Sequence, residues 1–392
     1  MQNQCHVLAT LFLCWFAELP VPAYPAVSPV PAHGLSNEKA AFGRTSDGQD
    51  VDIYTLRNTN GLTVEVLTYG ATIYSVQTPD RNGQLTNITA NCGSLADYEN
   101  RSPCFGALLG RYANRIAGAH FLLNGQEVSL SRNAGSNQIH GGFVGFHKHV
   151  WQAQRTNGAN LVALRLSYRS KDGEEGFPGT LNCLVVYELN NQNELKMEYR
   201  ATTDRPTVIN LSNHAYWNLA GAQSGNVLSQ VLTLNADKYL PADAELIPTG
   251  EILSVEKTPL DFRQPHRIGE RLNQITGAQF GGGYDHCLVL NHQQPGDVSF
   301  CARLVDPQSG RTMEVFTTQP GVQIFTANFP TDAFVGPHGY RYPKHFGLCL
   351  ETQHFPDSPN KPAFPSTILL PGDTYHVTTV HKFGLDHPPS AP

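Results

Sequence analysis

The 392-residue sequence has no apolar run near the length of about 20 residues that a membrane-spanning helix needs, so we expect no membrane partner. Residues Val7 to Ala17 are apolar but too few to span a bilayer, and they fit the hydrophobic part of a secretory signal. Val21-Pro22-Ala23 offers a small-residue cleavage site after Ala23, although Met1 to His6 include no Lys or Arg. We therefore predict a signal peptide over residues 1–23 and a secreted, extracellular protein, with a cytoplasmic protein as the alternative.

An excess of positive charge is also lacking, because 27 Lys and Arg stand against 33 Asp and Glu and give a formal net charge of −6. Binding to nucleic acid needs a basic face, so we expect no nucleic-acid partner. The eight cysteines include no CxxC pair and no cluster with histidine at zinc-finger spacing, and no HExxH motif occurs. These absences argue against a zinc site, and we expect neither a metal nor a cofactor.

Helical periodicity is nearly absent, and residues 268–275 form the one segment for which we predict a short helix. Stretches rich in β-branched, aliphatic and aromatic residues alternate instead with turns, for which the chain has 35 Gly and 27 Pro. The predicted strands cover residues 62–76, 161–168, 181–189, 195–202, 227–234, 313–318, 322–327, 348–352 and 374–382. Because nothing repeats at a fixed period, a propeller or solenoid is disfavoured.

We therefore predict an all-β fold, one large antiparallel β-sandwich from about residue 38 to residue 385. A proline-rich linker over residues 24–37 precedes it, a tail over residues 386–392 follows it, and no change in composition marks a second domain. We expect a monomer or a weak dimer. If the chain is secreted, Asn87 in Asn-Ile-Thr and Asn100 in Asn-Arg-Ser would be acceptors for N-glycosylation.

Four polar clusters interrupt the apolar pattern. They are GRYANRI at residues 110–116, NQIHGG at 137–142, NLSNHAYWNL at 210–219 and LCLETQHF at 348–355. Taken singly, each has an ordinary structural explanation, such as a solvated loop or an edge-strand carboxylate. Polar groups left unpaired inside a core cost about 1–3 kcal/mol each, so a strand with Asn213 and His214 at its centre needs partners for them. Together the clusters indicate a site rich in hydrogen-bonding groups.

In their order along the chain these clusters resemble the aldose 1-epimerase family, also called galactose mutarotases. The resemblance extends from about Ala40 to Phe383 and includes EEGFPGT, LPADAELIPTGEI, TPLDFR, GGGYDH, FTTQPGVQIFTANF and FGLCLETQHFPDSPNKPAFPSTILLPGDTY. It implies a large twisted β-sandwich with an open cleft, the galactose mutarotase-like supersandwich. It also implies an isomerase that interconverts the α and β anomers of a free hexose such as D-glucose or D-galactose.

The resemblance implies catalytic roles for three residues. Glu351 in LETQ matches the carboxylate that removes the proton from the anomeric hydroxyl. His214 in SNHAYWN matches the histidine that protonates the ring oxygen, and His140 in the HGG motif matches a second histidine that holds and polarises the sugar. For this chemistry Glu351 should be ionised and His214 protonated.

Further positions match residues of the family that bind sugar hydroxyls. These are Asn114 and Arg115 of the NR pair, Asp285 in YDH and Gln319 in TTQPG. Their side chains are suited to neutral hydroxyl groups, so a small aldohexose is the expected partner.

Three other functions stay open at this point. A catalytically weak sugar-binding module would lack the acid or the base, yet both His214 and Glu351 are present. A hexose-6-phosphate 1-epimerase of the same superfamily would want several basic residues around a phosphate, and only Arg115 clearly belongs to the site. A glycoside hydrolase needs two carboxylates across the scissile bond, whereas the partner of Glu351 is a histidine.

Overall fold

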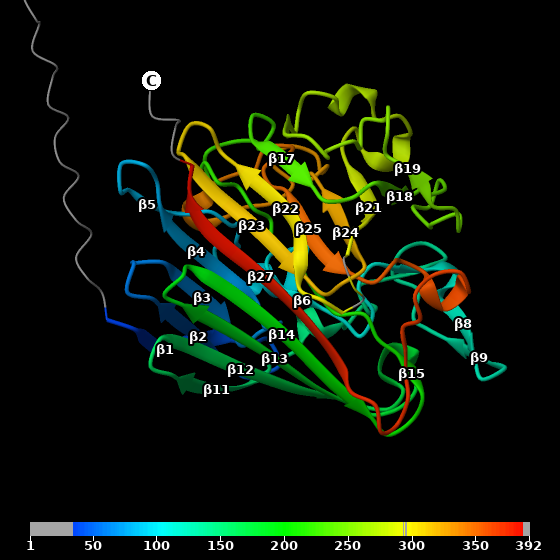
Figure 1. The fold of residues 1–392 in the computed structure, drawn as a ribbon. Coiled ribbons are helices and arrows are strands. Elements are labelled where there is room, and N and C mark those ends of the chain that lie inside the picture. Colours follow the sequence, from blue (N-terminus) through cyan, green and yellow to red (C-terminus); the bar gives the residue numbers. More distant parts are fainter. Residues whose placement is uncertain (1–33, 293, 295, 387–392) are drawn as a thin grey trace, which may run out of the picture.

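The computed structural model describes residues 34–292, 294 and 296–386 (Figure 1). The predicted signal peptide, most of the predicted linker and nearly all of the predicted tail lie outside these residues. Within them, no helix has both the length and the apolar character needed to cross a membrane. The first strand begins at Ser36 and the last strand ends at Leu385.

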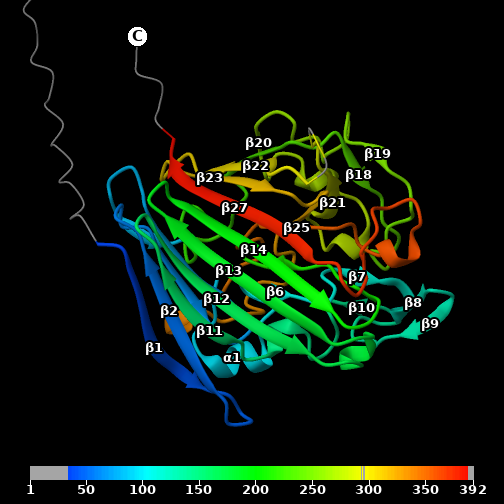
Figure 2. The same ribbon diagram turned by 60° about the horizontal axis from the view of Figure 1, so that its bottom comes forward.

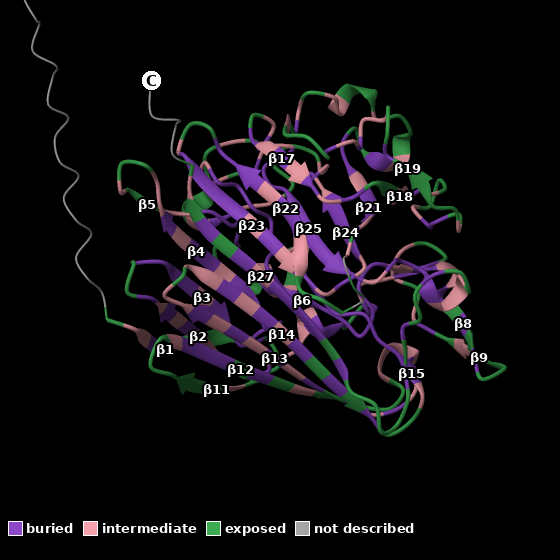
Figure 3. Cartoon of the chain, viewed as in Figure 1, coloured by how far each residue is buried: buried purple, intermediate pink, exposed green. Residues whose placement is uncertain are grey.

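The largest sheet has nine strands, and each strand pairs antiparallel with its neighbours. In spatial order they are β11 (Gln152–Asn157), β12 (Leu161–Ser170), β13 (Leu181–Asn190), β14 (Glu194–Thr203), β27 (Tyr375–Leu385), β23 (Arg311–Thr317), β22 (Ser299–Val305), β17 (Val231–Leu234) and β20 (His266–Arg267). Buried and more exposed residues alternate along β13 and β14, as Figure 3 shows. This period of two gives the sheet one apolar face.

Two five-stranded antiparallel sheets lie against that face (Figures 1 and 2). The first contains β1 (Ser36–Arg44), β2 (Asp50–Arg57), β3 (Thr63–Leu67), β4 (Ile73–Pro79) and β5 (Leu85–Asn87). The second runs in the order β19 (Leu253–Ser254), β18 (Lys238–Leu240), β21 (Asp285–Val289), β24 (Gly321–Phe325) and β25 (Cys349–Gln353). A single apolar core joins the three sheets, with Val64, Leu166 and Leu350 as one member from each. The predicted all-β antiparallel sandwich is therefore confirmed.

Short elements complete the described chain. Four two-stranded ribbons pair β6 (Leu108–Leu109) with β16 (Ser212–Asn213), β7 (Arg115–Ile116) with β10 (Gln138–Ile139), β8 (His120–Leu123) with β9 (Gln126–Ser129), and β15 (Thr207–Val208) with β26 (Ile368–Leu369). The α-helix α1 spans Leu95–Asn100. Single 3-10 turns lie at Ala117–Ala119, Phe146–Lys148, Glu174–Gly176, Leu272–Gln274, Ala278–Phe280, Pro337–Gly339 and Ser358–Asn360.

Some predicted elements differ from the observed ones. The predicted strand 62–76 is two strands, β3 and β4, because the chain turns back at Gly70, which has a φ of +66°. The predicted helix 268–275 shrinks to the 3-10 turn Leu272–Gln274. The backbone N–H groups of Ile268 and Gly269 donate to carbonyls of the segment that leads into β17, so tertiary hydrogen bonds hold the start of the predicted helix in a turn after β20.

Candidate active site

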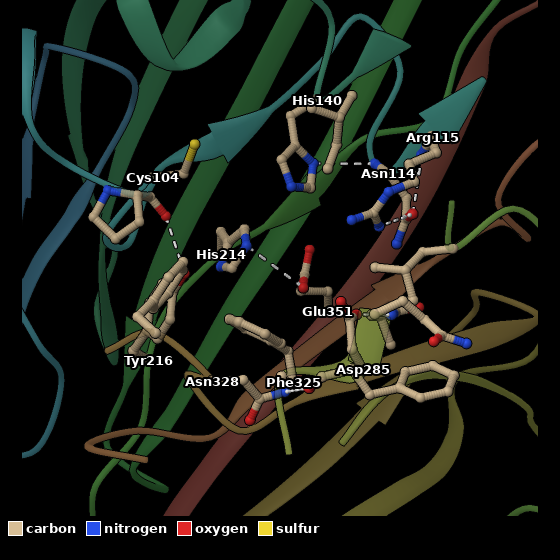
Figure 4. Close-up of a pocket in the computed structure, with 18 residues that line it drawn as sticks. Cys104, Asn114, Arg115, His140, His214, Tyr216, Asp285, Phe325, Asn328 and Glu351 are labelled. Carbon is tan, nitrogen blue, oxygen red and sulfur yellow. Dashed lines mark hydrogen bonds and ion pairs between the residues drawn. The ribbon is translucent and has the colours of Figure 1, made fainter. Parts of the chain in front are cut away.

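A cavity of about 390 Å³ brings residues of all four polar clusters together (Figure 4). Six of the seven predicted site residues line it, namely Asn114, Arg115, His140, His214, Asp285 and Glu351. Their positions span more than half of the chain, so only the fold assembles them. The remaining wall includes the aromatic residues Tyr216, Phe280, Phe325 and Phe329. A cavity that combines polar groups with aromatic faces is suited to a polyhydroxylated ring.

Glu351 is the central residue of β25 and points into the cavity. Its Oε1 atom is 3.6 Å from Nε2 of His214, and its Oε2 atom is buried without a hydrogen-bond partner in the described part of the chain. The residue is 2% exposed, and this burial is the main reason why the pKa of its carboxyl group is raised well above the ordinary value. The nearby Asp285 raises the pKa further, and Arg115 lowers it. Glu351 is thus a carboxyl group with unusually high proton affinity and one free oxygen.

His214 directly follows β16, and backbone hydrogen bonds hold it on both sides. Its N–H donates to the carbonyl of Ala107 and its own carbonyl accepts from the N–H of Gly106. The imidazole ring stacks on Tyr216 with centroids 4.8 Å apart. Burial lowers the pKa of His214 to about 4. The ring is therefore rigidly placed, and any proton that it takes is given up readily.

His140 ends the ribbon of β7 and β10, which sets it beside Asn114. Its backbone N–H donates to the Asn114 carbonyl, and its Nδ1 atom accepts a hydrogen bond of 3.1 Å from the Asn114 N–H. Burial, followed by the neighbouring His214 and Arg115, lowers the pKa of His140 well below its ordinary value. A neutral ring whose Nδ1 accepts a hydrogen bond carries its proton on Nε2. His140 is therefore a fixed hydrogen-bond donor to the cavity.

The same three side chains have the composition of a possible metal site. His140, His214 and Glu351 each offer an atom, and these atoms lie within 4.8 Å of one another. A histidine ligand, however, normally gives its second ring N–H to an acceptor, which leaves a lone pair for the metal. His140 has the opposite arrangement, because its Nδ1 atom accepts from Asn114. The donor set fits hydrogen bonding to a sugar oxygen better than it fits metal coordination.

Comparison with known proteins agrees with this geometry. The family model for aldose 1-epimerase matches residues 52–382. This chain belongs to the aldose 1-epimerase family. It is 42% identical to galactose mutarotase from Mus musculus over 353 residues, which cover 90% of this chain and 99% of that protein. It is 36% identical to aldose 1-epimerase from Escherichia coli K12 over 355 residues, which cover 89% and 99% respectively.

Solved structures of the family share the fold. Galactose 1-epimerase from Lactobacillus acidophilus matches with a TM-score of 0.77 at 28% identity, covering 90% of this chain and all of the other. An aldose epimerase homologue from C. elegans matches with the same TM-score at 27% identity and the same coverage. The family membership and the fold that the sequence motifs implied are both confirmed.

Next to Glu351 and His214 in this epimerase, the alternation of side chains along the strands decides which residues face the cavity. Gln323 on β24 lies opposite Glu351 on β25 in the sheet register, and both line the cavity. The Nε2 atom of Gln323 donates to Oδ1 of Asp285 at 2.6 Å. Sequence reasoning missed Gln323. The alternation in Gly321-Val-Gln-Ile-Phe325 could have found it, because Val322 and Ile324 belong to the core and Gln323 must then face the other way.

Gln319 is the one predicted site residue that the structure places away from the cavity. It is 1% exposed, and its Nε2 atom donates to the carbonyl of Leu211 and to the hydroxyl of Tyr375. It lies in the turn before β24 and ties that turn to neighbouring segments. The hydroxyl-binding role implied for the glutamine of TTQPG therefore has no geometric basis here, and Gln323 occupies the place expected for it.

Burial works against the charges expected for the acid–base pair. Glu351 was expected to be ionised and His214 protonated, but burial raises the pKa of Glu351 well above its ordinary value and lowers that of His214 to about 4. In the free site burial therefore disfavours the charged form of both side chains. Because sugar hydroxyls and Arg115 can hydrogen-bond to the carboxylate, substrate binding is the step that can stabilise the charged pair.

Proposed function

We propose that this chain, an isomerase of the aldose 1-epimerase family, interconverts the α and β anomers of D-galactose and D-glucose with Glu351 and His214 as its acid–base pair. The observation that carries this proposal is the approach of Nε2 of His214 to Oε1 of Glu351, 3.6 Å apart in a cavity of about 390 Å³. A pyranose ring has its anomeric hydroxyl and its ring oxygen on one carbon. A base and an acid this close can therefore reach both atoms of one sugar.

The reaction consists of ring opening, rotation and reclosure. Ionised Glu351 takes the proton of the anomeric hydroxyl, and protonated His214 gives a proton to the ring oxygen, so that the bond between that oxygen and C1 breaks. The open-chain aldehyde then faces a protonated Glu351 and a neutral His214, which is the state that burial favours. After rotation about the C1–C2 bond both protons return and the ring closes on the other face. His140 donates a hydrogen bond to a sugar oxygen throughout.

An unphosphorylated sugar fits the cavity better than a sugar phosphate. Arg115 is the one Lys or Arg side chain among the residues that line the cavity. It is near Glu351 and Asp285 and affects the pKa of both. A phosphate group in proteins is normally met by several convergent donors with positive charge. The charge balance of this cavity therefore favours neutral hydroxyl groups.

The proposed roles are tested by the variants Glu351→Gln and His214→Asn in a polarimetric assay with freshly dissolved α-D-galactose and α-D-glucose. Each should lower kcat by roughly 10²–10⁴-fold while circular dichroism stays native. The exposed residues Glu251 and His338 supply controls, and Glu251→Gln and His338→Asn should retain wild-type rates. Near-wild-type rates in folded Glu351→Gln would remove Glu351 from the mechanism. Cleavage of aryl galactosides without anomerisation would indicate a hydrolase instead.

We also propose that the protein is secreted, as a monomer or weak dimer without membrane or nucleic-acid partners. The N-terminal apolar segment supports secretion, and two sequons make it testable. Asn100 is exposed at the end of α1, where its amide makes one hydrogen bond to the carbonyl of Ala96, whereas the half-buried amide of Asn87 makes three hydrogen bonds to the backbone of Val76 and Thr89. Expression through a secretory pathway should give a chain that starts near Tyr24 and carries a glycan on Asn100 but not on Asn87. Retention in the cytoplasm with an intact Met1 would contradict the proposal.

A further inference from the structure

His214 has a second close polar neighbour, Cys349, on the side of its ring that does not face Glu351. The Sγ atom of Cys349 is 3.4 Å from Nδ1 of His214, while Nε2 faces Glu351. Cys349 and Glu351 are two residues apart on β25, so both side chains project from the same face of that strand. Cys349 does not line the cavity. One strand thus supplies a neighbour to each nitrogen of the histidine.

The sulfur of Cys349 is a thiol and not a thiolate. The residue is fully buried, and burial, followed by the charges of Glu351 and Asp285, raises the pKa of its thiol well above the ordinary value. A nucleophilic cysteine needs the reverse, a lowered pKa and access to the substrate. Cys349 is therefore excluded as a nucleophile. What it can do is exchange a hydrogen bond with Nδ1 of His214.

The acid–base chemistry decides the direction of that hydrogen bond. His214 gives the proton of Nε2 to the ring oxygen and later takes it back at the same atom. Between these steps Nε2 must present a lone pair, so the neutral ring must hold its remaining proton on Nδ1. The Nδ1–H then points at Sγ of Cys349, which accepts it. The raised pKa of Glu351 is compatible with this arrangement, since a proton on its carboxyl group can point toward the lone pair of Nε2.

We propose that Cys349 is a positioning residue that holds neutral His214 in its Nδ1–H tautomer and so makes Nε2 the nitrogen that exchanges protons with the sugar. A neutral sulfur is a weak acceptor, so it orients the ring without stabilising the imidazolium as a carboxylate would. The imidazolium stays acidic, which favours proton transfer to the ring oxygen. His140 has the opposite tautomer because its Nδ1 atom accepts from the Asn114 N–H. The two histidines that line the cavity thus have different roles. His140 donates a hydrogen bond from Nε2 because its Nδ1 atom accepts from Asn114, and His214 exchanges a proton at Nε2 because its Nδ1–H is held by Cys349.

The experiment compares Cys349→Ala, which removes the acceptor, with Cys349→Ser, which keeps one. Histidine labelled with ¹⁵N reports in the free protein which ring nitrogen carries the proton, and the His214→Asn variant assigns the His214 signals. Wild type and Cys349→Ser should show a protonated Nδ1 in His214. Cys349→Ala should show a mixture of tautomers. Cys301→Ala is the matched control, because Cys301 is fully buried in the nine-stranded sheet and does not line the cavity.

The link to catalysis rests on the proposed function and is measured separately. Cys349→Ala should lower kcat about tenfold with little change in KM, and Cys349→Ser should restore most of the loss. The positioning role is overturned if neutral His214 in the wild-type protein carries its proton on Nε2. It is also overturned if Cys349→Ala changes neither the tautomer of His214 nor kcat. The two claims can fail separately. If the wild-type protein converts no aldose but His214 carries its proton on Nδ1, the proposed function is refuted and the hydrogen bond between His214 and Cys349 is supported.

Discussion

Gln319 and Gln323 are four positions apart in one motif, yet only Gln323 reaches the cavity. Gln319 lies in a turn and is bound to the backbone of Leu211 and to Tyr375. Gln323 lies inside β24, on the face opposite the core, and meets Asp285. A motif fixes which residue types are present, but the side of the sheet on which each one projects depends on where the strand begins. A shift of four positions thus separates a glutamine buried in a turn from one that lines the cavity.

We predict that Gln323→Ala raises KM for galactose by up to about tenfold, because a hydrogen bond between uncharged groups contributes about 0.5–1.5 kcal/mol. Gln319→Ala should leave KM within about threefold of wild type but lower the free energy of unfolding by about 1–3 kcal/mol, since it leaves buried groups unpaired. Steady-state kinetics and urea unfolding measure the two effects. The assignment of the two glutamines is reversed if Gln319→Ala is the variant with the raised KM.

The HGG turn is the element that sets His140 and the backbone around it. Gly141 has a φ of +82°, and a Cβ atom at this position would be 1.9 Å from the carbonyl oxygen of Gly110. That carbonyl also accepts the N–H of Phe146, so it cannot move freely. Because Gly141 has no side chain, the backbone of the turn can approach the backbone at Gly110 more closely than it could with any other residue at position 141. Its glycine is needed for the close approach as well as for the conformation.

Gly141→Ala should lower the free energy of unfolding by about 2–4 kcal/mol and reduce kcat, because the clash displaces the adjacent His140. Gly135→Ala is a matched control in the same loop. Gly135 also has a positive φ, +64°, but nothing lies within 4 Å of the position of its Cβ atom. It should cost only about 1 kcal/mol and leave kcat unchanged. Equal losses of stability in the two variants, measured by urea unfolding, would show that conformation and not close approach sets the cost.

For the whole molecule, burial in the three-sheet core changes the pH dependence of stability. His381 on β27 packs against Trp217, and neither of its ring nitrogens has a hydrogen-bond partner among the described residues. Burial lowers its pKa to about 3. In the unfolded chain a histidine titrates near 6.5, so between about pH 6.5 and pH 3 the unfolded chain binds a proton that the folded chain does not. Stability is therefore lost as the pH falls through this window.

His381→Leu removes that proton uptake and two unpaired buried nitrogens. The variant should unfold at a higher urea concentration than wild type at pH 7.5. Its advantage should grow by about 1–2 kcal/mol between pH 7.5 and pH 5, because one pKa unit corresponds to about 1.4 kcal/mol. Urea unfolding at the two pH values measures this. Parallel losses of stability in wild type and variant would rule out His381 as a contributor to acid lability.

The sequence by itself determined the fold class, the family and most of the chemistry. Stretches rich in β-branched, aliphatic and aromatic residues predicted the strands, and in β13 and β14 buried residues alternate with more exposed ones because a strand has two faces. The roles predicted for Glu351, His214 and His140 came from the resemblance of their motifs to the aldose 1-epimerase family, and the structure brings the three side chains into one cavity. The signal peptide, the linker and the tail stay predictions.

Only the tertiary structure decided how the residues of the site act. Burial is a property of the whole fold, and it shifts the pKa values of Glu351 and His214 in the directions that oppose their expected charges. The register of β24 and β25 places Gln323, and not Gln319, beside Glu351 in the cavity, and the Nδ1 atoms of His140 and His214 meet different partners. A sequence pattern describes only residues that are a few positions apart. Protonation and proton transfer depend instead on atoms that are a few ångströms apart in space, and their residues can be more than a hundred positions apart in the sequence.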